Sequence, residues 1–302
     1  MRASLLGALA IGTAASIWGV SAIYFTLLDA NALEIVAHRT FWSLIFFLII
    51  LAVQGRMAEF AAVLRNWRRL GPVIAGAVMV ATNWLLFVYA VQIGRATEAS
   101  IGYFILPLIT AALGAVVLKE RFNGLQRVAF GFAAVAVLVL TWGLGAAPWI
   151  GLLLAGTFAV YSLIKKQLDI GPVMSVAIEV ALVGPALLAW VFWQSGGLGQ
   201  FGASVGHAAW FIGLVGFTGF PLMLFAYGSK RMPLASAGLV TYINPTMQFL
   251  VAAVYFSEPL GWPHMIAMPL IWIGLALHSI NAFRQERARR ALIRAGTSVT
   301  VS

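Results

Sequence analysis

The sequence predicts an all-α integral membrane protein in which ten transmembrane helices form two inverted five-helix repeats. Three observations support this fold class. The composition is 62% hydrophobic and 9% charged, with a mean hydropathy of +0.96, whereas roughly a quarter of the residues in soluble domains are charged. Long apolar runs recur along the whole chain. One apolar stretch occurs twice.

The repeated stretch comprises residues 96–120 and 234–258, which align without a gap at an offset of 138 positions. Each copy is long enough to cross a bilayer as a helix, which takes roughly 20 apolar residues. A period this long indicates two halves of one membrane domain and not a solenoid. Glu120 and Glu258 close the copies, and we expect them to cap or gate the following helices. The predicted domains are two five-helix repeats at 1–143 and 148–283, with a basic cytoplasmic tail at 284–302.

Glycines, prolines and charge clusters divide the apolar runs into ten candidate spans. The first run begins like a signal peptide but continues to Leu28, beyond the 7–15 residues of a signal h-region, so we expect an uncleaved span. The segments 55–70 and 194–207 are expected to be loops. The ten ranges are roughly 3–27, 32–54, 71–92, 97–117, 125–143, 148–165, 173–193, 208–228, 235–256 and 263–283.

The basic residues predict the orientation of these spans, because cytoplasmic loops retain lysine and arginine. With both termini in the cytoplasm, all of the 19 lysines and arginines except Arg39 and Arg95 fall on the cytoplasmic side. The two copies of the repeat lie in the fourth and ninth spans. Because five helices separate them, they cross the membrane in opposite senses, as in many secondary transporters. The surplus positive charge fits this topology and a tail against anionic lipid, and we expect no nucleic-acid partner.

Polar residues share one face of each repeated helix. Lipid cannot satisfy hydroxyl and amide groups, so such a stripe is expected to line a water-filled cavity. Hydrogen bonding between helices is the alternative. Pro107 and Pro245 each free a carbonyl one turn back and are predicted hinges. The stripe contains Ser100, Tyr103, Pro107 and Thr110 in the first copy and Gly238, Thr241, Pro245 and Gln248 in the second, with Asn244 beside them.

Aromatic residues inside the spans suggest walls for an amphipathic or aromatic solute. Trp18 and Trp84 lie deep in their spans, unlike the tryptophans at span ends, which are typical interface anchors. Tyr161 and Tyr227 lie in the sixth and eighth spans. We take these four side chains as candidate substrate-binding residues.

Four ionisable residues inside spans are candidates for coupling. Glu34, His38, Arg39 and Glu179 each need a partner or water, because an ionisable group in a span costs roughly 2.5–3.5 kcal/mol on insertion scales. Arg39 and Glu179 correspond at an offset of 140 positions. Inversion places them in opposite halves of the bilayer, so we expect a local partner for each. Glu179 is the candidate proton-coupling carboxylate.

Several function classes find no support in the sequence. There is no cysteine, and the four histidines lack metal-binding spacing, so we expect no metal site and no cofactor. No Walker motif or clustered catalytic set favours an ATPase or a membrane enzyme. A channel remains the alternative to a carrier, although it has no need of two mobile halves. The expected partners are a small-molecule substrate and membrane lipid, in a monomer or a homodimer.

Four motifs resemble the RarD branch of the EamA family, in the drug/metabolite transporter superfamily. They are EIVAHRTFWS, NWLLFVYAV, EASIGYFILPLITAALGAVVLKERF and PLMLFAYGSKRMPLASAGLVTYINPTMQFLVAAVYFSEPL, and the resemblance covers nearly the whole chain up to Arg284. It implies a carrier of the bacterial inner membrane with a ten-helix inverted-repeat fold and a central cavity. Such carriers often export small metabolites or amino acids.

The resemblance also carries the family motif onto individual residues. It adds Asn83 and Tyr242 to the candidate substrate-binding residues already derived from the stripe and the aromatic positions. The motif residues are Glu34, His38, Arg39, Trp42, Asn83, Trp84, Tyr103, Pro107, Tyr242, Pro245 and Gln248.

Overall fold

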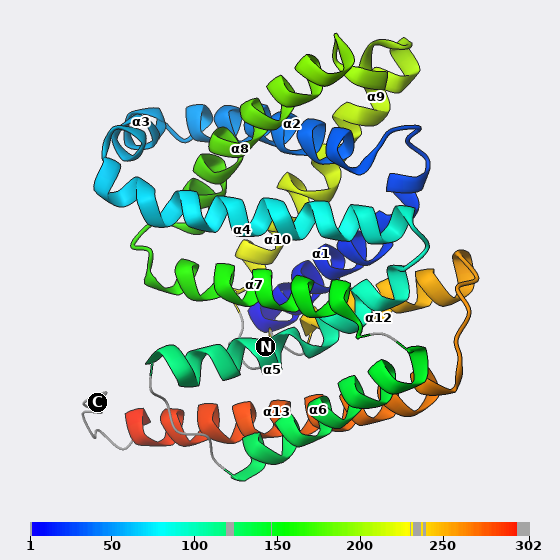
Figure 1. Cartoon of the computed structure of the whole chain (residues 1–302). Coiled ribbons are helices and arrows are strands. Elements are labelled where there is room, and N and C mark those ends of the chain that lie inside the picture. The colour runs from blue at the N-terminus through cyan, green and yellow to red at the C-terminus, as the bar shows by residue number, and fades with distance from the viewer. Residues whose placement is uncertain are drawn as a thin grey trace.

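The computed structural model describes residues 2–118, 124–145, 147–229, 231, 237 and 240–294. Over these residues the chain is helical, and none of them forms a strand. Long helices lie side by side across the whole molecule (Figure 1). The all-α prediction is therefore confirmed for the described part of the chain. Two predicted positions, Glu120 and Gly238, lie outside it.

The helices follow one another with short connections. Short elements are the 3-10 helices η1 and η2 and the π-helical turn η3. In chain order the elements are α1 (Arg2–Thr26), α2 (Ala32–Val53), α3 (Met57–Arg65), α4 (Trp67–Gln92), α5 (Ala96–Leu118), α6 (Gly124–Leu144), α7 (Trp149–Gln167), α8 (Pro172–Ser195), η1 (Gly199–Gly202), α9 (Val205–Gly213), η2 (Leu214–Phe217), α10 (Gly219–Ser229), α12 (Ile243–Leu250), η3 (Val251–Tyr255) and α13 (Trp262–Arg294).

Eight stretches of the described chain are helical, long and apolar enough to cross a membrane. They correspond to eight of the expected spans. The expected sixth span is α7, whose apolar part, Trp149–Lys165, is shorter than the others. The expected ninth span, 235–256, falls partly outside the described residues, and its described part is α12 followed by η3. The chain is thus a multi-pass helical membrane protein, and the count of ten stays a prediction.

The segments expected to be loops contain helices. The first holds α3, where Phe60 and Val63 are buried while Arg56 and Glu59 form an exposed ion pair. The loop prediction was wrong there because apolar residues three positions apart form one face even in a short, charged segment. The second holds η1 and the start of α9, which Ser204 caps by accepting a hydrogen bond from the His207 N–H.

The expected span 208–228 is not one continuous helix. The described chain passes from α9 through η2 to α10, and Thr218 between them has non-helical backbone angles, φ −127° and ψ −66°. Pro221 explains the break, because proline has no N–H to donate to the carbonyl four residues earlier. That carbonyl belongs to Phe217, and it is left to find other donors.

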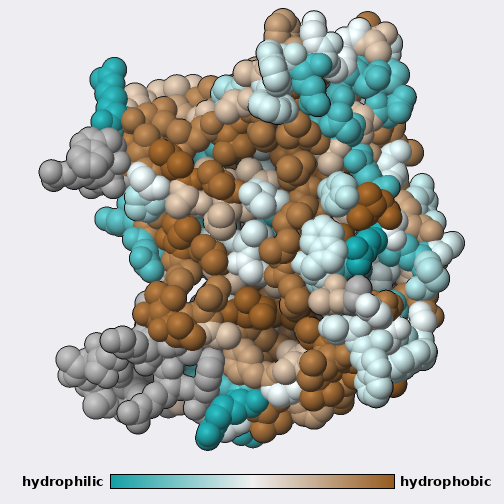
Figure 2. Space-filling view, viewed as in Figure 1, coloured by the Kyte–Doolittle hydropathy of each residue, from teal (hydrophilic) through white to brown (hydrophobic). Residues whose placement is uncertain are grey.

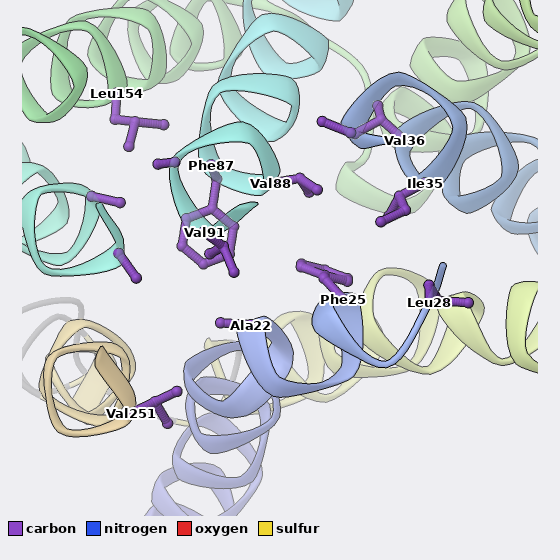
Figure 3. Packing of buried hydrophobic residues seen from close by; sticks show 14 of the residues in the cluster. Ala22, Phe25, Leu28, Ile35, Val36, Phe87, Val88, Val91, Leu154 and Val251 are labelled. Atoms are coloured by element: carbon purple, nitrogen blue, oxygen red, sulfur yellow. The ribbon is translucent and has the colours of Figure 1, made fainter. Parts of the chain in front are cut away.

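Buried apolar side chains from several helices hold the bundle together. Figure 3 shows Phe25 of α1 and Phe87 of α4 pointing toward a common centre, with Ile35 of α2 beside them. Hydrophobic side chains also form a broad band over the surface in Figure 2, and hydrophilic ones gather at its margins. A belt of this kind matches the hydrocarbon core of a bilayer. Trp142 and Val116, which are 87% and 76% exposed, belong to the exposed apolar surface.

The helices pack in a definite set of pairs. α2 packs against α8, α6 against α13, and α5 against α12. α1 packs against α10 and α12, while α7 packs against α4 and α5. α5 and α7 cross at Gly102 and Gly151, where a Cβ on Gly102 would collide with the Gly151 backbone. Away from this crossing α5 and α7 diverge toward the left of Figure 1.

The two ends of the bundle differ in charge. We call the left end in Figure 1, which carries the α2–α3 and α7–α8 connections and the end of α13, the basic end. Arg56, Lys165 and Arg284 belong to it. The opposite end carries the α1–α2 and α4–α5 connections and η1, with Glu34 and Glu98 near it.

Candidate functional site

Arg39 of α2 is buried in the interior, with 5% of its surface exposed. Its Nε donates to the Thr218 hydroxyl at 2.6 Å, and its Nη2 donates to the Phe217 carbonyl at 3.3 Å. The guanidinium carbon lies 4.7 Å from the centre of the Trp84 ring and 5.7 Å from that of Phe25. The guanidinium is therefore held at the break before α10 by neutral acceptors and ring faces.

Trp18 of α1 reaches the same carbonyl. Its Nε1 donates to the Phe217 oxygen at 3.1 Å. The carbonyl that Pro221 leaves without a helical donor thus accepts from both Trp18 and Arg39. A buried carbonyl without a partner would be destabilising, so these two side chains stabilise the broken helix.

Asn83 ties three helices together beside this point. It is fully buried in α4, and its Nδ2 donates to the Leu154 carbonyl at 2.8 Å and to the Thr157 hydroxyl at 3.1 Å. The Tyr103 hydroxyl of α5 donates to Asn83 Oδ1 at 2.7 Å. The amide therefore fixes the position of the Tyr103 ring relative to α4 and α7.

Aromatic rings connect Arg39 to another buried charge, Glu179. Phe25 contacts Phe87 at a ring-centroid distance of 6.3 Å, and Phe87 contacts Tyr103 at 5.8 Å. Tyr103 contacts Phe158 at 6.4 Å, and Phe158 contacts Tyr161 at 5.4 Å. We call these five rings the aromatic chain. It leads from Arg39 to Glu179.

Glu179 of α8 lies in a network of its own near the basic end and is 2% exposed. The Tyr161 hydroxyl donates to Glu179 Oε2 at 2.9 Å, and Lys165 Nζ donates to Oε1 at 2.8 Å. Lys165 also donates to the Ser175 hydroxyl at 2.6 Å, which in turn donates to Glu179 Oε1 at 2.9 Å. The buried carboxylate is thus both paired and hydrogen-bonded.

Arg39 and Glu179 do not contact each other among the described residues; each has its own partners, as expected from the sequence. The predicted residues Trp18, Asn83, Trp84 and Tyr103 gather around Arg39, and Tyr161 contacts Glu179.

The predicted residues of the second repeat copy lie elsewhere. Gln248 is buried, and its Nε2 donates to Asn244 Oδ1 at 3.1 Å, while the Thr241 hydroxyl donates to the Ala237 carbonyl at 2.9 Å. These bonds stay within one segment of chain. Tyr242 is hydrogen-bonded to Ser279.

Tyr227 and the two predicted hinge prolines are apart from the Arg39 cluster. Tyr227 is 42% exposed and carries the Arg231 guanidinium over its ring at 3.5 Å. Pro107 lies inside α5, and Pro245 is buried inside α12.

Glu34 and His38 hold the segment of η1 against α2. Glu34 accepts a hydrogen bond from the Gln200 N–H, and a Cβ on Gly199 would collide with the Glu34 carboxylate. His38 Nε2 is 3.1 Å from the Leu198 carbonyl and donates to it, and the imidazole stacks on Phe201 at 5.0 Å. Glu34 and His38, two of the coupling candidates, therefore hold the η1 segment in place at the opposite end.

Two further carboxylates cap helices at that end. Glu258 accepts from the N–H groups of Ala96 and Thr97, at 2.6 and 2.7 Å, at the start of α5. Glu98 of α5 accepts from the Ile150 N–H at 2.7 Å, at the start of α7. A carboxylate at a helix N-terminus satisfies orphan N–H groups and interacts favourably with the helix dipole. Glu258 caps the start of α5 and not the helix that follows it, so that expectation was wrong about the target.

Some of these residues escaped the sequence analysis. Lys165, at the end of the expected sixth span, was counted only as a cytoplasmic basic residue, although its position one turn after Tyr161 could have placed it beside Glu179. Pro221 could have indicated the broken helix, because it has the same property that singled out Pro107. Glu98 gave no signal, since only the tertiary arrangement brings it to α7. No cluster of potential metal ligands occurs among the described residues.

The fold and the site define the chain as a multi-pass helical membrane protein with charged and aromatic side chains in its interior. The model of the EamA-like transporter family matches residues 5–142 and again 146–280, and the chain belongs to this family. We call these two segments the first half and the second half.

The chain is similar to several named proteins over nearly its whole length. It is 37% identical to Protein RarD of Streptomyces exfoliatus, covering 94% of this chain and 91% of the relative. It is 34% identical to an uncharacterized transporter of Pseudomonas aeruginosa, with coverage of 91% and 93%. It is 32% identical to Protein RarD of Escherichia coli, with coverage of 90% and 93%. The chain is thus a RarD-like member of the family.

A solved crystal structure of a protein shares the fold. The TM-score is 0.59 at 18% sequence identity, and the match covers 94% of this chain and 99% of that chain. At this identity the likeness concerns the fold alone.

Proposed function

We propose that the protein is a secondary transporter that exports small metabolites, or amphipathic and amino-acid-like solutes, across the bacterial inner membrane. It works by alternating access between two inverted five-helix repeats, with both termini in the cytoplasm. Export is coupled to protons through Glu179. The names of the relatives support the transporter class, whereas the solute class, the direction of transport and the coupling are our proposal.

The pattern of helix contacts is the observation that carries the proposal. An inverted repeat relates α1 to α7, α2 to α8, α4 to α9 and α10, α5 to α12, and α6 to α13. Under this relation the α1–α10 and α1–α12 contacts become the α7–α4 and α7–α5 contacts, and all four occur. The α2–α8, α5–α12 and α6–α13 contacts map onto themselves. A bundle with this pseudo-two-fold pairing has two equivalent arrangements, which alternating access requires.

The interior supports a solute path between the two arrangements. The opposite end is closed by Glu34, Glu98 and Glu258, each accepting backbone N–H groups from another segment. The aromatic chain runs from Arg39 near that end to Glu179 near the basic end. Rings offer apolar faces to an amphipathic solute, while the amide and hydroxyl groups beside them fix its orientation. Closure at this end fits a cytoplasm-facing state.

The proton-coupling role of Glu179 rests on its neighbours. When the buried Glu179 carboxylate is protonated it loses its negative charge, and its electrostatic attraction to the Lys165 ammonium is lost with it. Because Lys165 is on α7 and Glu179 is on α8, the change acts between two helices of the second half.

The proposal is tested in two steps. Metabolites released by bacterial cells that express the protein are compared, untargeted, with those of cells that lack it. The solute that accumulates outside is then loaded into proteoliposomes for counterflow and for flux driven by a pH gradient. We expect saturable counterflow. Flux without saturation or counterflow indicates the alternative, a channel, and equal release from both strains contradicts export.

A further inference from the structure

We propose that Arg39 is an anion-binding subsite, and that the solute of this protein is an organic anion with an aromatic or apolar body, whose carboxylate pairs with the Arg39 guanidinium. This inference rests on the proposed transport function and adds the charge and the shape of the solute to it.

The first argument is the charge of the Arg39 surroundings. The guanidinium is buried, and its hydrogen-bond acceptors are the Thr218 hydroxyl and the Phe217 carbonyl, both neutral. No ion pair among the described residues includes it. A buried cation without a counter-ion is strongly disfavoured, so an anion that enters gains the full attraction of an uncompensated charge.

The second argument is a contrast within the same chain. Glu179, the buried charge at the corresponding position of the second half, has a counter-ion from the protein, because Lys165 donates to it at 2.8 Å. Arg39 and Glu179 occupy corresponding positions in the two halves. The protein supplies a counter-ion to Glu179 and, among the described residues, none to Arg39.

The third argument is geometric. A guanidinium has more N–H donors than the two hydrogen bonds of Arg39 use, and its planar fork matches a carboxylate in a bidentate arrangement. The Trp84 ring covers one face of the Arg39 guanidinium at 4.7 Å, so a ligand would bind to the N–H groups at the edge of the guanidinium. Trp18, Trp84 and Tyr103 are each partly exposed, so the cluster is not sealed by its own packing.

The fourth argument concerns the body of the solute. The aromatic chain begins at Phe25, over which the Arg39 guanidinium also lies, at 5.7 Å. A solute whose carboxylate pairs with Arg39 therefore places its remaining atoms against rings, where aromatic and apolar groups gain most.

The test uses three probes of nearly equal size and different charge: phenylacetate, phenylacetamide and phenethylamine. Each is titrated against the purified full chain in lipid nanodiscs, and the rise in melting temperature gives the half-saturating concentration. We expect the value for phenylacetate to be about tenfold lower than that for the amide. Phenethylamine should give no rise. An equal or stronger response to the amide or the amine, or no response to phenylacetate, would overturn the subsite.

Variants then assign the preference to Arg39. Arg39→Gln should abolish the difference between phenylacetate and phenylacetamide. Arg39→Lys should keep the preference with about tenfold weaker binding, because an ammonium is a point charge without the planar fork. Arg56→Gln, which removes an exposed arginine of α3, is the matched control and should behave as wild type.

One more variant separates binding from the structural role of Arg39 at the broken helix. Thr218→Val removes the acceptor of Nε but keeps the charge, so it should retain the anion preference even where it lowers the melting temperature. Loss of the preference in Thr218→Val to the same extent as in Arg39→Gln would contradict the subsite. Counterflow is measured separately on the same preparations. Anion preference without counterflow refutes the carrier, whereas counterflow without anion preference refutes only the subsite.

Discussion

Lys165 Nζ on α7 and Glu179 Oε1 on α8 are 2.8 Å apart, and this ion pair is largely buried. The Glu179 side chain is 2% exposed and the Lys165 side chain 21%. Such a pair stabilises through its mutual attraction but is expensive to desolvate, so removing one partner is far more harmful than removing both.

We therefore predict that Glu179→Gln lowers the free energy of unfolding by about 3 kcal/mol, because it leaves the Lys165 ammonium without its counter-ion. Denaturant titration in mixed micelles measures this. The double variant Lys165→Met with Glu179→Leu should return to within about 1 kcal/mol of wild type. Flux driven by a pH gradient should be lost in both, and additive destabilisation in the double variant would contradict this view of the pair.

The cap that Glu258 places on α5 should control the access of small molecules to the interior from the opposite end. Losing a carboxylate at a helix N-terminus costs about 1 kcal/mol, which corresponds to roughly a fivefold change in a population. In this naturally cysteine-free chain, we predict that Glu258→Ala raises the reaction of Tyr103→Cys with an impermeant thiol reagent added outside by about that factor.

Two controls accompany the thiol experiment. Leu138→Cys on the exposed face of α6 should stay unreactive, because a thiol in hydrocarbon remains protonated. Glu59→Ala removes an exposed carboxylate at the basic end and should leave the labelling of the Tyr103 position unchanged. An increase with Glu59→Ala as large as with Glu258→Ala would show that the effect is not specific to the cap.

The crossing of α5 and α7 at Gly102 should tolerate no side chain. Gly102→Ala places a Cβ against the Gly151 backbone, and backbone cannot move aside as a flexible side chain can. We predict a loss of about 2 kcal/mol in the free energy of unfolding. Gly131→Ala in α6 is the matched control, since its Cβ would meet open space and alanine favours a helix by about 0.5–1 kcal/mol. Comparable destabilisation of the two variants would refute the close crossing.

Pro221 should matter for transport more than Pro107 does. Pro221→Ala supplies an N–H that can bond the Phe217 carbonyl, in competition with Trp18 and Arg39. We predict normal membrane insertion and transport slowed by about tenfold, since a bond to a charged donor is worth about 1.5–3 kcal/mol. Pro107→Ala should have a smaller effect, because no charged side chain among the described residues is hydrogen-bonded to the carbonyl that Pro107 frees. The reverse order in the counterflow assay would restore Pro107 as the main hinge.

Reporter fusions test the orientation. Because the basic loops are retained in the cytoplasm, every fusion after a basic segment should report a cytoplasmic location. Periplasmic readings at any two positions would overturn the topology of ten spans with both termini inside. The fusion sites are Arg69, Arg127, Lys166, Arg231 and Arg290.

The helical class and most span positions could be predicted from the sequence, because burying apolar side chains in lipid needs only local composition. Trp18, Trp84 and Tyr103 could be proposed for the same reason: an aromatic or polar residue deep in a span is conspicuous. The partners of these residues could not be predicted. Arg39 bonds Thr218, which is 179 positions away, and only packing of the helices decides such a contact.

The interruption of the eighth expected span shows a different limit. Residues 208–228 are apolar throughout, so hydropathy alone indicates one span. By length and hydropathy, Val205–Ser229 is indeed one candidate span. Backbone hydrogen bonding, and not apolarity, breaks the helix before Pro221. The helices that Glu98 and Glu258 cap could not be predicted for a related reason, because a cap on another helix leaves no pattern in the neighbouring sequence.

The two caps at the opposite end are exchanged between the halves. Glu258 belongs to the second half and closes a helix start in the first half, and Glu98 belongs to the first half and closes a helix start in the second. The start of α5 and the start of α7 are therefore each capped by the other half. If the chain were cut between the halves, each fragment would carry a carboxylate that only the other fragment can use. The exchanged caps would therefore favour association of the two fragments in the membrane even without the covalent link.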